Sequence, residues 1–186
     1  MKLEFEWIAK RLEKQPACTV LDVGAGRSEN STDSNDLVKW LLNHSHKVIG
    51  NDLKAVTYTH PNFTFFQGSF LDNKLQDEQF DLVVSVSTLH HIGKPYSISV
   101  PEEKIQQEDM KGPSKTLSEI SRVLKMEGDF FLSVVIRPSS SRKDTWDWCR
   151  EDVLALVDPC FKVIEEEVLG DLHYTYFLLH LKKKGN

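Results

Sequence analysis

Short apolar runs alternate along the chain with longer segments whose apolar residues recur every three or four positions. The short runs predict strands over 19–23, 47–51, 62–67, 81–86, 130–136, 161–169 and 174–181. The longer segments predict helices over 4–14, from Ser34 or Asn35 onward, over 114–124 and over 147–157. Helices between successive strands favour parallel pairing, whereas the short turn at Gly170-Asp171 makes the last two strands antiparallel neighbours. The pattern therefore predicts an α/β fold with a mainly parallel sheet.

Breaks in this pattern mark the loops. Segment 93–113 contains two glycines and three prolines, so it cannot form one long helix, although a short helix over 102–108 fits its middle. Ser114 is the expected cap of the helix that follows. Residues 127–129 are expected to form a turn into the fifth strand.

Composition narrows the class of protein. The chain has 186 residues, which fits a single domain over 1–186, and its 40% hydrophobic and 27% charged residues are typical of a globular chain. Lys and Arg number 23 against 28 Asp and Glu, and the net charge of −5 argues against nucleic acid as a partner. No apolar segment approaches the roughly 20 residues of a membrane helix, so no membrane partner is expected.

The cysteines and histidines offer no metal or disulfide framework. Cys18, Cys149 and Cys160 are odd in number and form no CxxC pair, which fits a reducing compartment and predicts a cytoplasmic protein. His44 and His46 lie in a turn between a predicted helix and a strand, with no third ligand at a telling spacing. We therefore predict no metal site.

The most informative stretch is the turn after the first strand. Asp22 is followed by Gly24 and Gly26, and two alternating glycines let the backbone approach a ligand closely before the next helix. The dinucleotide fingerprint needs a third glycine where this chain has Glu29, whose carboxylate would face a pyrophosphate. No Gly-Lys-Ser/Thr follows, so a P-loop is excluded as well. A ligand-free glycine turn of an α/β protein remains the plain alternative.

Five segments in order resemble the motifs of the class I (Rossmann-like) S-adenosylmethionine-dependent methyltransferases, small-molecule (type 11-like) branch. Residues 20–26 are similar to the first motif, hydrophobic-hydrophobic-(D/E)-x-G-x-G, and residues 48–53 to the second. Residues 66–70 occupy the place of a Gly-Asp pair, and residues 80–91 closely resemble the fourth motif, FDxVxSxxxLHH. Residues 117–130 resemble the helix-turn-strand element RVLKPGGxF.

The chain departs from the family pattern at a few positions. Ser28 stands where many relatives have a third glycine, and Ser69 stands where they have the Asp that reads the adenine amino group. Met126 and Glu127 replace Pro and Gly in the helix-turn-strand element. A serine at position 69 can still accept a hydrogen bond. None of these departures changes the order of the motifs.

The resemblance implies a fold, a cofactor and a set of contacts. The fold is a seven-stranded sheet in the order 3-2-1-4-5-7-6, with the last strand antiparallel and helices on both faces. The cofactor is S-adenosylmethionine, bound by Asp22, Gly24, Ala25, Gly26, Asp52, Leu53, Ser69, Phe70 and Ser87. In the family, the carboxylate at position 52 accepts hydrogen bonds from both ribose hydroxyls, a role that suits its two acceptor oxygens.

The chemistry expected from the resemblance is an in-line displacement at an activated methyl group, for which the enzyme mainly aligns the reactants. His90 and His91 follow the fourth strand and are candidate general bases, with packing as their alternative role. Segments 93–113 and 137–148 are the expected acceptor-side loops, and the second contains Trp146.

The acceptor is expected to be a small molecule or a glycan. Residues 85–88, Ser-Val-Ser-Thr, lack the Asn/Asp-Pro-Pro-aromatic clamp with which amino-methylating nucleic-acid enzymes hold a flipped base. A monomer or homodimer is expected. Two alternatives stay open: a catalytically inactive, methyltransferase-like binding or regulatory subunit, and a nicotinamide oxidoreductase, which Glu29 disfavours.

Overall fold

A seven-stranded sheet forms the centre of the molecule. The computed structural model describes residues 2–26, 35–44, 46–94, 109–136, 146–170 and 175–185. The strands are β1 (Thr19–Val23), β2 (Lys47–Asp52), β3 (Phe63–Gln67), β4 (Phe80–Val86), β5 (Leu124–Ile136), β6 (Phe161–Gly170) and β7 (Thr175–Lys183). Their order is β3-β2-β1-β4-β5-β7-β6, and β7 runs antiparallel to both of its neighbours, while the pairs from β3 to β5 are parallel. The predicted fold class is confirmed.

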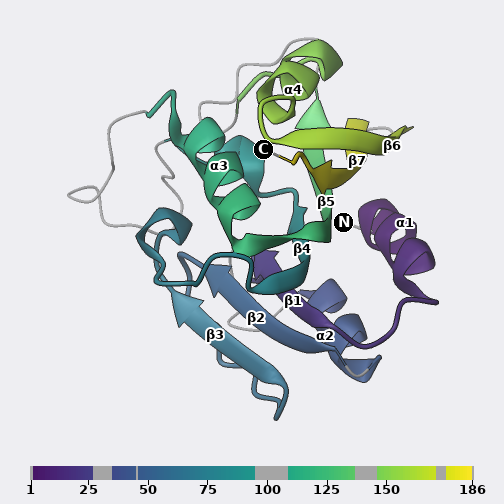
Figure 1. The fold of residues 1–186 in the computed structure, drawn as a ribbon, viewed down its shortest axis with the longest axis vertical. Coiled ribbons are helices and arrows are strands. Elements are labelled where there is room, and N and C mark those ends of the chain that lie inside the picture. The colour runs from purple at the N-terminus through teal and green to yellow at the C-terminus, as the bar shows by residue number, and fades with distance from the viewer. Residues whose placement is uncertain are drawn as a thin grey trace.

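Helices cover both faces of this sheet (Figure 1). They are α1 (Lys2–Leu12), α2 (Asp36–Asn43), α3 (Gly112–Val123) and α4 (Arg150–Val157), and two short 3-10 turns, η1 (Phe70–Asp72) and η2 (Leu89–His91), follow β3 and β4. Side chains of α1 and α2 pack on one face of the sheet, and those of α3 and α4 pack on the other. Within the parts of the chain given above, no helix is long and apolar enough to cross a membrane.

The alternation of side chains along each strand explains the two cores. In β1, Val20 belongs to the core under α1 and α2, whereas Leu21 and Val23 belong to the core under α3 and α4. Strands buried on both faces have nearly continuous apolar runs in the sequence, which is why the predicted bounds of β1 and β4 agree closely with the observed ones.

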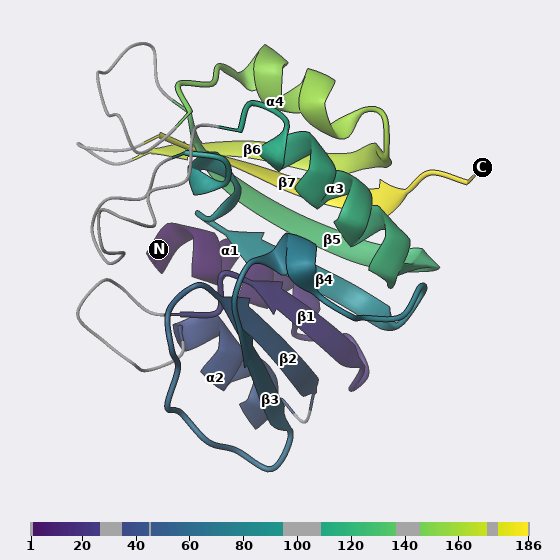
Figure 2. The ribbon, with the colours of Figure 1, turned by 90° about the vertical axis from the view of Figure 1, so that its left-hand side faces the viewer.

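The strand order reverses between β1 and β4. The chain proceeds from β1 outward through β2 to β3, then returns to the centre and proceeds through β4 to β5. Ligands of open α/β sheets bind outside the carboxyl ends of the strands at such a point. The N-terminal end of α1 lies on this same side of the molecule (Figure 2).

Local details differ from the sequence-based expectations at two places. Ser114 does not cap α3, which begins at Gly112 with Lys111 as its N-cap and Pro113 in its first turn. Proline suits that position because its missing N–H would have no partner in the first turn of a helix. Residues 127–129 form no separate turn, since β5 is continuous from Leu124 and accommodates extra residues as an irregularity opposite β4. The predicted helix over 102–108 lies outside the described residues.

Candidate active site

The glycine turn after β1 fits against two neighbouring strands because positions 24 and 26 have no side chains. Gly24 has φ of +95°, and a Cβ atom there would lie 1.9 Å from Oγ1 of Thr88, just beyond β4. A Cβ atom on Gly26 would lie 2.7 Å from Oδ2 of Asp52, at the end of β2. The turn is thereby held between the carboxyl ends of β2 and β4, where the topology predicts a ligand.

Asp52 faces this turn from β2. Its Oδ2 accepts a hydrogen bond from the backbone N–H of Gly26 at 3.0 Å, and its Oδ1 accepts one from the N–H of Lys54 at 3.0 Å. Each carboxylate oxygen has about two acceptor positions, so Asp52 keeps capacity for two further donors. The carboxylate is partly exposed. This arrangement fits the recognition of two adjacent hydroxyl groups.

Asp22 lies in β1, two residues before Gly24, and is fully buried. Its Oδ2 accepts a hydrogen bond from the side-chain amide of Asn35 at 2.9 Å, whereas its Oδ1 has no hydrogen-bond partner among the residues that the structure describes. Burial raises the pKa of the Asp22 carboxyl to about 7; the Asn35 hydrogen bond opposes this rise and the nearby charge of Asp52 adds to it. A buried, incompletely paired carboxyl group beside a ligand turn fits a cationic ligand.

Asn35 links this carboxyl group to the start of α2. Its Oδ1 accepts a hydrogen bond from the N–H of Val38 at 2.8 Å, so it caps the helix as the sequence predicts. Its own N–H donates to the carbonyl of Ala25 at 2.9 Å. Ala25 itself is fully buried, and its own N–H donates to the carbonyl of Asn51 at 2.9 Å.

Three further residues predicted to contact the cofactor occupy different environments. Leu53, next to Asp52, is 57% exposed, an unusual state for a large apolar side chain at the end of a buried strand. Ser69 caps η1, where its hydroxyl accepts a hydrogen bond from the N–H of Leu71 at 3.2 Å. Phe70 is 5% exposed and packs in the core on the α3 side. The structure thus places Leu53 at the surface and Phe70 in the core.

Ser87 follows β4 in a left-handed backbone conformation, with φ of +50°, which is uncommon for a residue with a side chain. Its hydroxyl donates a hydrogen bond to Oε1 of Glu4 at 2.6 Å, and its N–H donates to the carbonyl of Ser133 at 3.0 Å. Sequence reasoning missed Glu4. The available signal was its spacing, because Glu4 lies four residues before Ile8 and eight before Leu12, on the buried stripe of α1.

The two predicted base candidates differ in access. The ring of His90 is buried, with 3% of the residue exposed, whereas His91 is partly exposed. Their ring centroids lie 4.3 Å apart at the start of the acceptor-side loop. Of the two, only His91 is positioned to meet a ligand from solvent without a rearrangement.

The described ends of the two acceptor-side loops meet beside these histidines. The N–H of Trp146 donates to the carbonyl of His90 at 2.9 Å, and its indole N–H donates to the carbonyl of Ile92 at 2.8 Å. Nζ of Lys94 lies 3.9 Å from the centre of the Trp146 ring, a cation–π contact. The remainder of both loops, 95–108 and 137–145, lies outside the described residues.

The histidines considered for a metal are engaged elsewhere. His44 stacks on Trp40 at 3.8 Å between ring centroids, and Nδ1 of His46 lies 3.3 Å from Sγ of Cys18. Among the residues that the structure describes, no group of three His, Cys, Asp or Glu side chains is placed to hold a metal ion.

Residues 21–132 match the family model described as a methyltransferase domain. This chain belongs to the methyltransferase family. The matched segment starts within β1 and ends within β5, so it contains the glycine turn, Asp52 and the β4 end. The methyltransferase is therefore an enzyme whose methyl donor is S-adenosylmethionine. A search of curated proteins found no match.

Solved structures confirm the fold. A Burkholderia thailandensis 1,6-didemethyltoxoflavin-N1-methyltransferase, with bound 1,6-didemethyltoxoflavin and S-adenosylhomocysteine, superposes with a TM-score of 0.75 at 15% identity, covering 99% of this chain and 78% of that one. The N-methyltransferase NodS of Bradyrhizobium japonicum, in complex with S-adenosylhomocysteine, gives a TM-score of 0.67 at 12% identity, covering 99% of this chain and 87% of that one. At these identities the likeness establishes the fold alone.

Proposed function

We propose that this methyltransferase transfers a methyl group from S-adenosylmethionine to a small-molecule acceptor, bound beyond the carboxyl ends of β1 and β4. When bound, S-adenosylmethionine supplies a methyl group on a positively charged sulfur, already activated for displacement. The observation that carries the proposal is the convergence of Asp22, Gly24, Gly26 and Asp52 at the point where the strand order reverses. Both solved structures contain S-adenosylhomocysteine, and one also contains 1,6-didemethyltoxoflavin, which supports the same assignment here.

The donor is held by backbone on one side and by carboxylates on the other. Gly24 and Gly26 let the turn approach the amino-acid end of the donor, and Asp52 accepts hydrogen bonds from its ribose hydroxyls. The exposed side chain of Leu53 offers an apolar surface to the adenine ring, and Ser69 offers a polar group at its edge. The buried carboxyl group of Asp22 favours a ligand with positive charge, which S-adenosylmethionine carries and a pyrophosphate does not.

The acceptor side is formed by η2 and by Trp146. Where the acceptor atom must lose a proton, the accessible imidazole of His91 is the candidate base. Trp146 and Lys94 form an aromatic and cationic wall, which suits a planar or anionic small molecule. The net charge of −5 supports the same choice. The free thiols of Cys18, Cys149 and Cys160 support the proposed cytoplasmic location.

Two measurements test the proposal in sequence. Calorimetric titration with S-adenosylhomocysteine and, separately, with NADH tests the donor site, and we expect binding of the first only. Incubation of the enzyme with methyl-labelled S-adenosylmethionine and a panel of small metabolites then tests transfer. Donor binding without transfer to any acceptor would favour the binding-subunit alternative, and NADH binding would overturn the assignment of the turn.

A further inference from the structure

Glu4 is a fully buried carboxylate in the first turn of α1. The N-terminal end of α1 lies on the same side of the molecule as the proposed donor site (Figure 2). Its Oε1 accepts hydrogen bonds from the hydroxyl groups of Ser87, at 2.6 Å, and of Ser133 in β5. One oxygen atom of the helix is thus bonded to the end of β4 and to the neighbouring strand. No role described above requires this carboxylate.

The β4 end needs such a partner because its backbone is strained. Ser87 has φ of +50°, a conformation that residues other than Gly, Asn and Asp seldom adopt without support. Its hydroxyl is directed toward Glu4, so what Ser87 presents to the donor site is backbone. Thr88, the next residue, lies against Gly24, where a Cβ atom would be 1.9 Å from its Oγ1. The conformation of Ser87 therefore determines how β4 meets the glycine turn.

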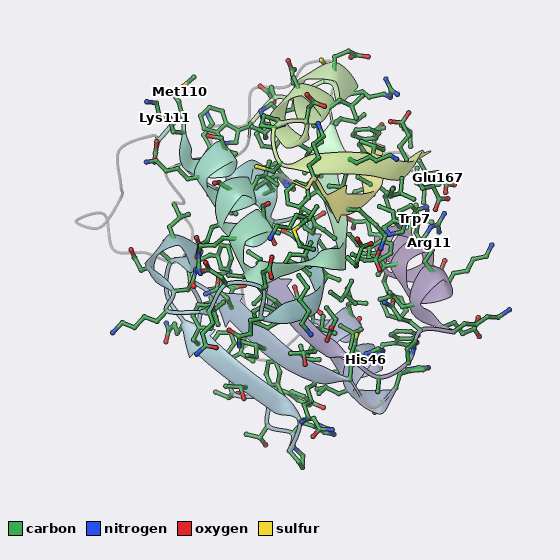
Figure 3. All side chains as sticks on the ribbon, in the orientation of Figure 1. Trp7, Arg11, His46, Met110, Lys111 and Glu167 are labelled. Carbon is green, nitrogen blue, oxygen red and sulfur yellow. The ribbon has the colours of Figure 1, made fainter. Side chains whose placement is uncertain are left out.

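Anchoring α1 to the sheet does not require Glu4. The indole N–H of Trp7 donates to Glu167 at 2.6 Å, and Arg11 pairs with Glu165 and stacks 3.7 Å from the centre of the Trp7 ring. Figure 3 shows Trp7, Arg11 and Glu167 together on the side of α1 that faces β6. The apolar side chain of Ile8 is also fully buried under the helix. A carboxylate is costly to bury, so an additional anchor would be better served by an apolar residue.

We propose that Glu4 is a positioning residue of the methyltransferase: by accepting hydrogen bonds from Ser87 and Ser133, it holds Ser87 in its left-handed conformation and thereby shapes the donor site at the end of β4. This inference rests on the proposed donor site. According to this inference, α1 contributes to cofactor affinity in addition to packing against the sheet.

The test compares the affinity for S-adenosylhomocysteine, measured by calorimetry, with the thermal unfolding midpoint of each unliganded variant. Glu4→Gln keeps an acceptor oxygen for the serines, and its dissociation constant is expected to stay within about threefold of the wild type. Glu4→Ala removes the acceptor and is expected to raise the constant about tenfold or more. Glu6→Gln, an exposed position on the same helix, is the matched control and is expected to change neither quantity.

A second substitution separates positioning from a structural role. Glycine adopts positive φ without a steric penalty, so Ser87→Gly added to Glu4→Ala is expected to recover much of the lost affinity even though it restores no hydrogen bond. A Glu4→Ala variant that binds as tightly as the wild type would overturn the inference. So would a loss of affinity that Ser87→Gly fails to relieve, because Glu4 would then act through packing alone. Failure of the wild type to bind S-adenosylhomocysteine would instead refute the proposed donor site, which keeps the two failures distinct.

Discussion

The carboxylate of Asp52 accepts a hydrogen bond from the backbone N–H of Gly26, with 3.0 Å between Oδ2 and the nitrogen. This contact joins the end of β2 to the glycine turn after β1, two segments that lie 26 residues apart in the sequence. It fixes the orientation of a carboxylate that still has acceptor capacity on both oxygens. Asp52 is therefore already oriented for a ligand with paired hydroxyl groups.

Replacement of Asp52 by alanine is expected to weaken binding of S-adenosylhomocysteine by about 1–3 kcal/mol, because charge-assisted hydrogen bonds to the ribose are lost. Asp52→Asn keeps one acceptor oxygen for Gly26 and is expected to lose less. Calorimetric titration measures both, and Glu13→Ala, at an exposed position, serves as the control. Equal affinities for all three variants would show that Asp52 does not contact the ribose.

The two glycines of the turn are expected to respond differently to alanine. Gly24→Ala forces a side chain into a backbone with φ of +95° and against Thr88, so the free energy of unfolding is expected to fall by roughly 1–3 kcal/mol. Gly26→Ala meets mainly the carboxylate of Asp52, which can rotate, so it is expected to lower ligand affinity with little loss of stability. Gly185→Ala is the control, since its nearest neighbour would be Met126 Cε at 3.6 Å.

Urea unfolding and calorimetry together measure these effects. The expectation fails if Gly24→Ala is as stable as the wild type, or if Gly26→Ala binds S-adenosylhomocysteine with unchanged affinity. The first result would mean that the turn can relax away from β4. The second would mean that the orientation of Asp52 does not matter for the ligand.

The strands and their order could be predicted because both faces of the central strands are buried and the motifs keep their spacing. Local features that depend on single contacts were harder to predict from the sequence. Pro113 was read as a helix breaker, although it occupies the first turn of α3, where proline is tolerated. The irregular pairing of β5 with β4 depends on neighbours far along the chain, which a local turn signal at 127–129 does not reveal.

In the candidate site, too, some residues were predictable from local sequence and others were not. The glycine turn and Asp52 were recognised from local sequence, because backbone approach and strand ends have a short-range signature. Phe70 was expected to contact the cofactor. Its side chain packs in the core, and an aromatic residue after a strand gives no local sign of which way its side chain will turn. Glu4 was overlooked because a charged residue on an amphipathic helix is ordinarily assigned to the exposed face.

Substitution of the two adjacent histidines is expected to separate catalysis from packing. His91→Asn should lower kcat about 10²-fold or more with an acceptor that must be deprotonated, while the affinity for S-adenosylhomocysteine stays unchanged. His90→Asn should mainly lower the unfolding midpoint, because this side chain is buried. Steady-state kinetics across the pH range and thermal unfolding distinguish the two. Wild-type turnover by His91→Asn would exclude this residue as the base.

The raised pKa of Asp22 predicts a contribution to stability that depends on pH. Its pKa is about 7 in the folded protein against 3.8 for the ordinary group, so between these values the folded state holds the proton more tightly than the unfolded chain. This contribution to stability is complete below the unfolded pKa and is lost as pH rises through about 7. Carboxyl groups with lowered pKa, such as Asp129 beside His180 and Lys182, have the opposite dependence, which is why only a comparison between variants isolates Asp22.

Asp22→Asn removes the titrating group and keeps its shape. The free energy of unfolding of the variant, relative to that of the wild type, is therefore expected to increase by on the order of 2–4 kcal/mol as pH rises from about 5 to about 8. Urea unfolding of the unliganded proteins at several pH values measures this difference. The same variant is expected to bind the cationic S-adenosylmethionine more weakly than the wild type above pH ~7, because the buried negative charge is gone. A stability difference independent of pH would show that Asp22 is ionised throughout, and its unpaired oxygen would then have to be satisfied without a proton.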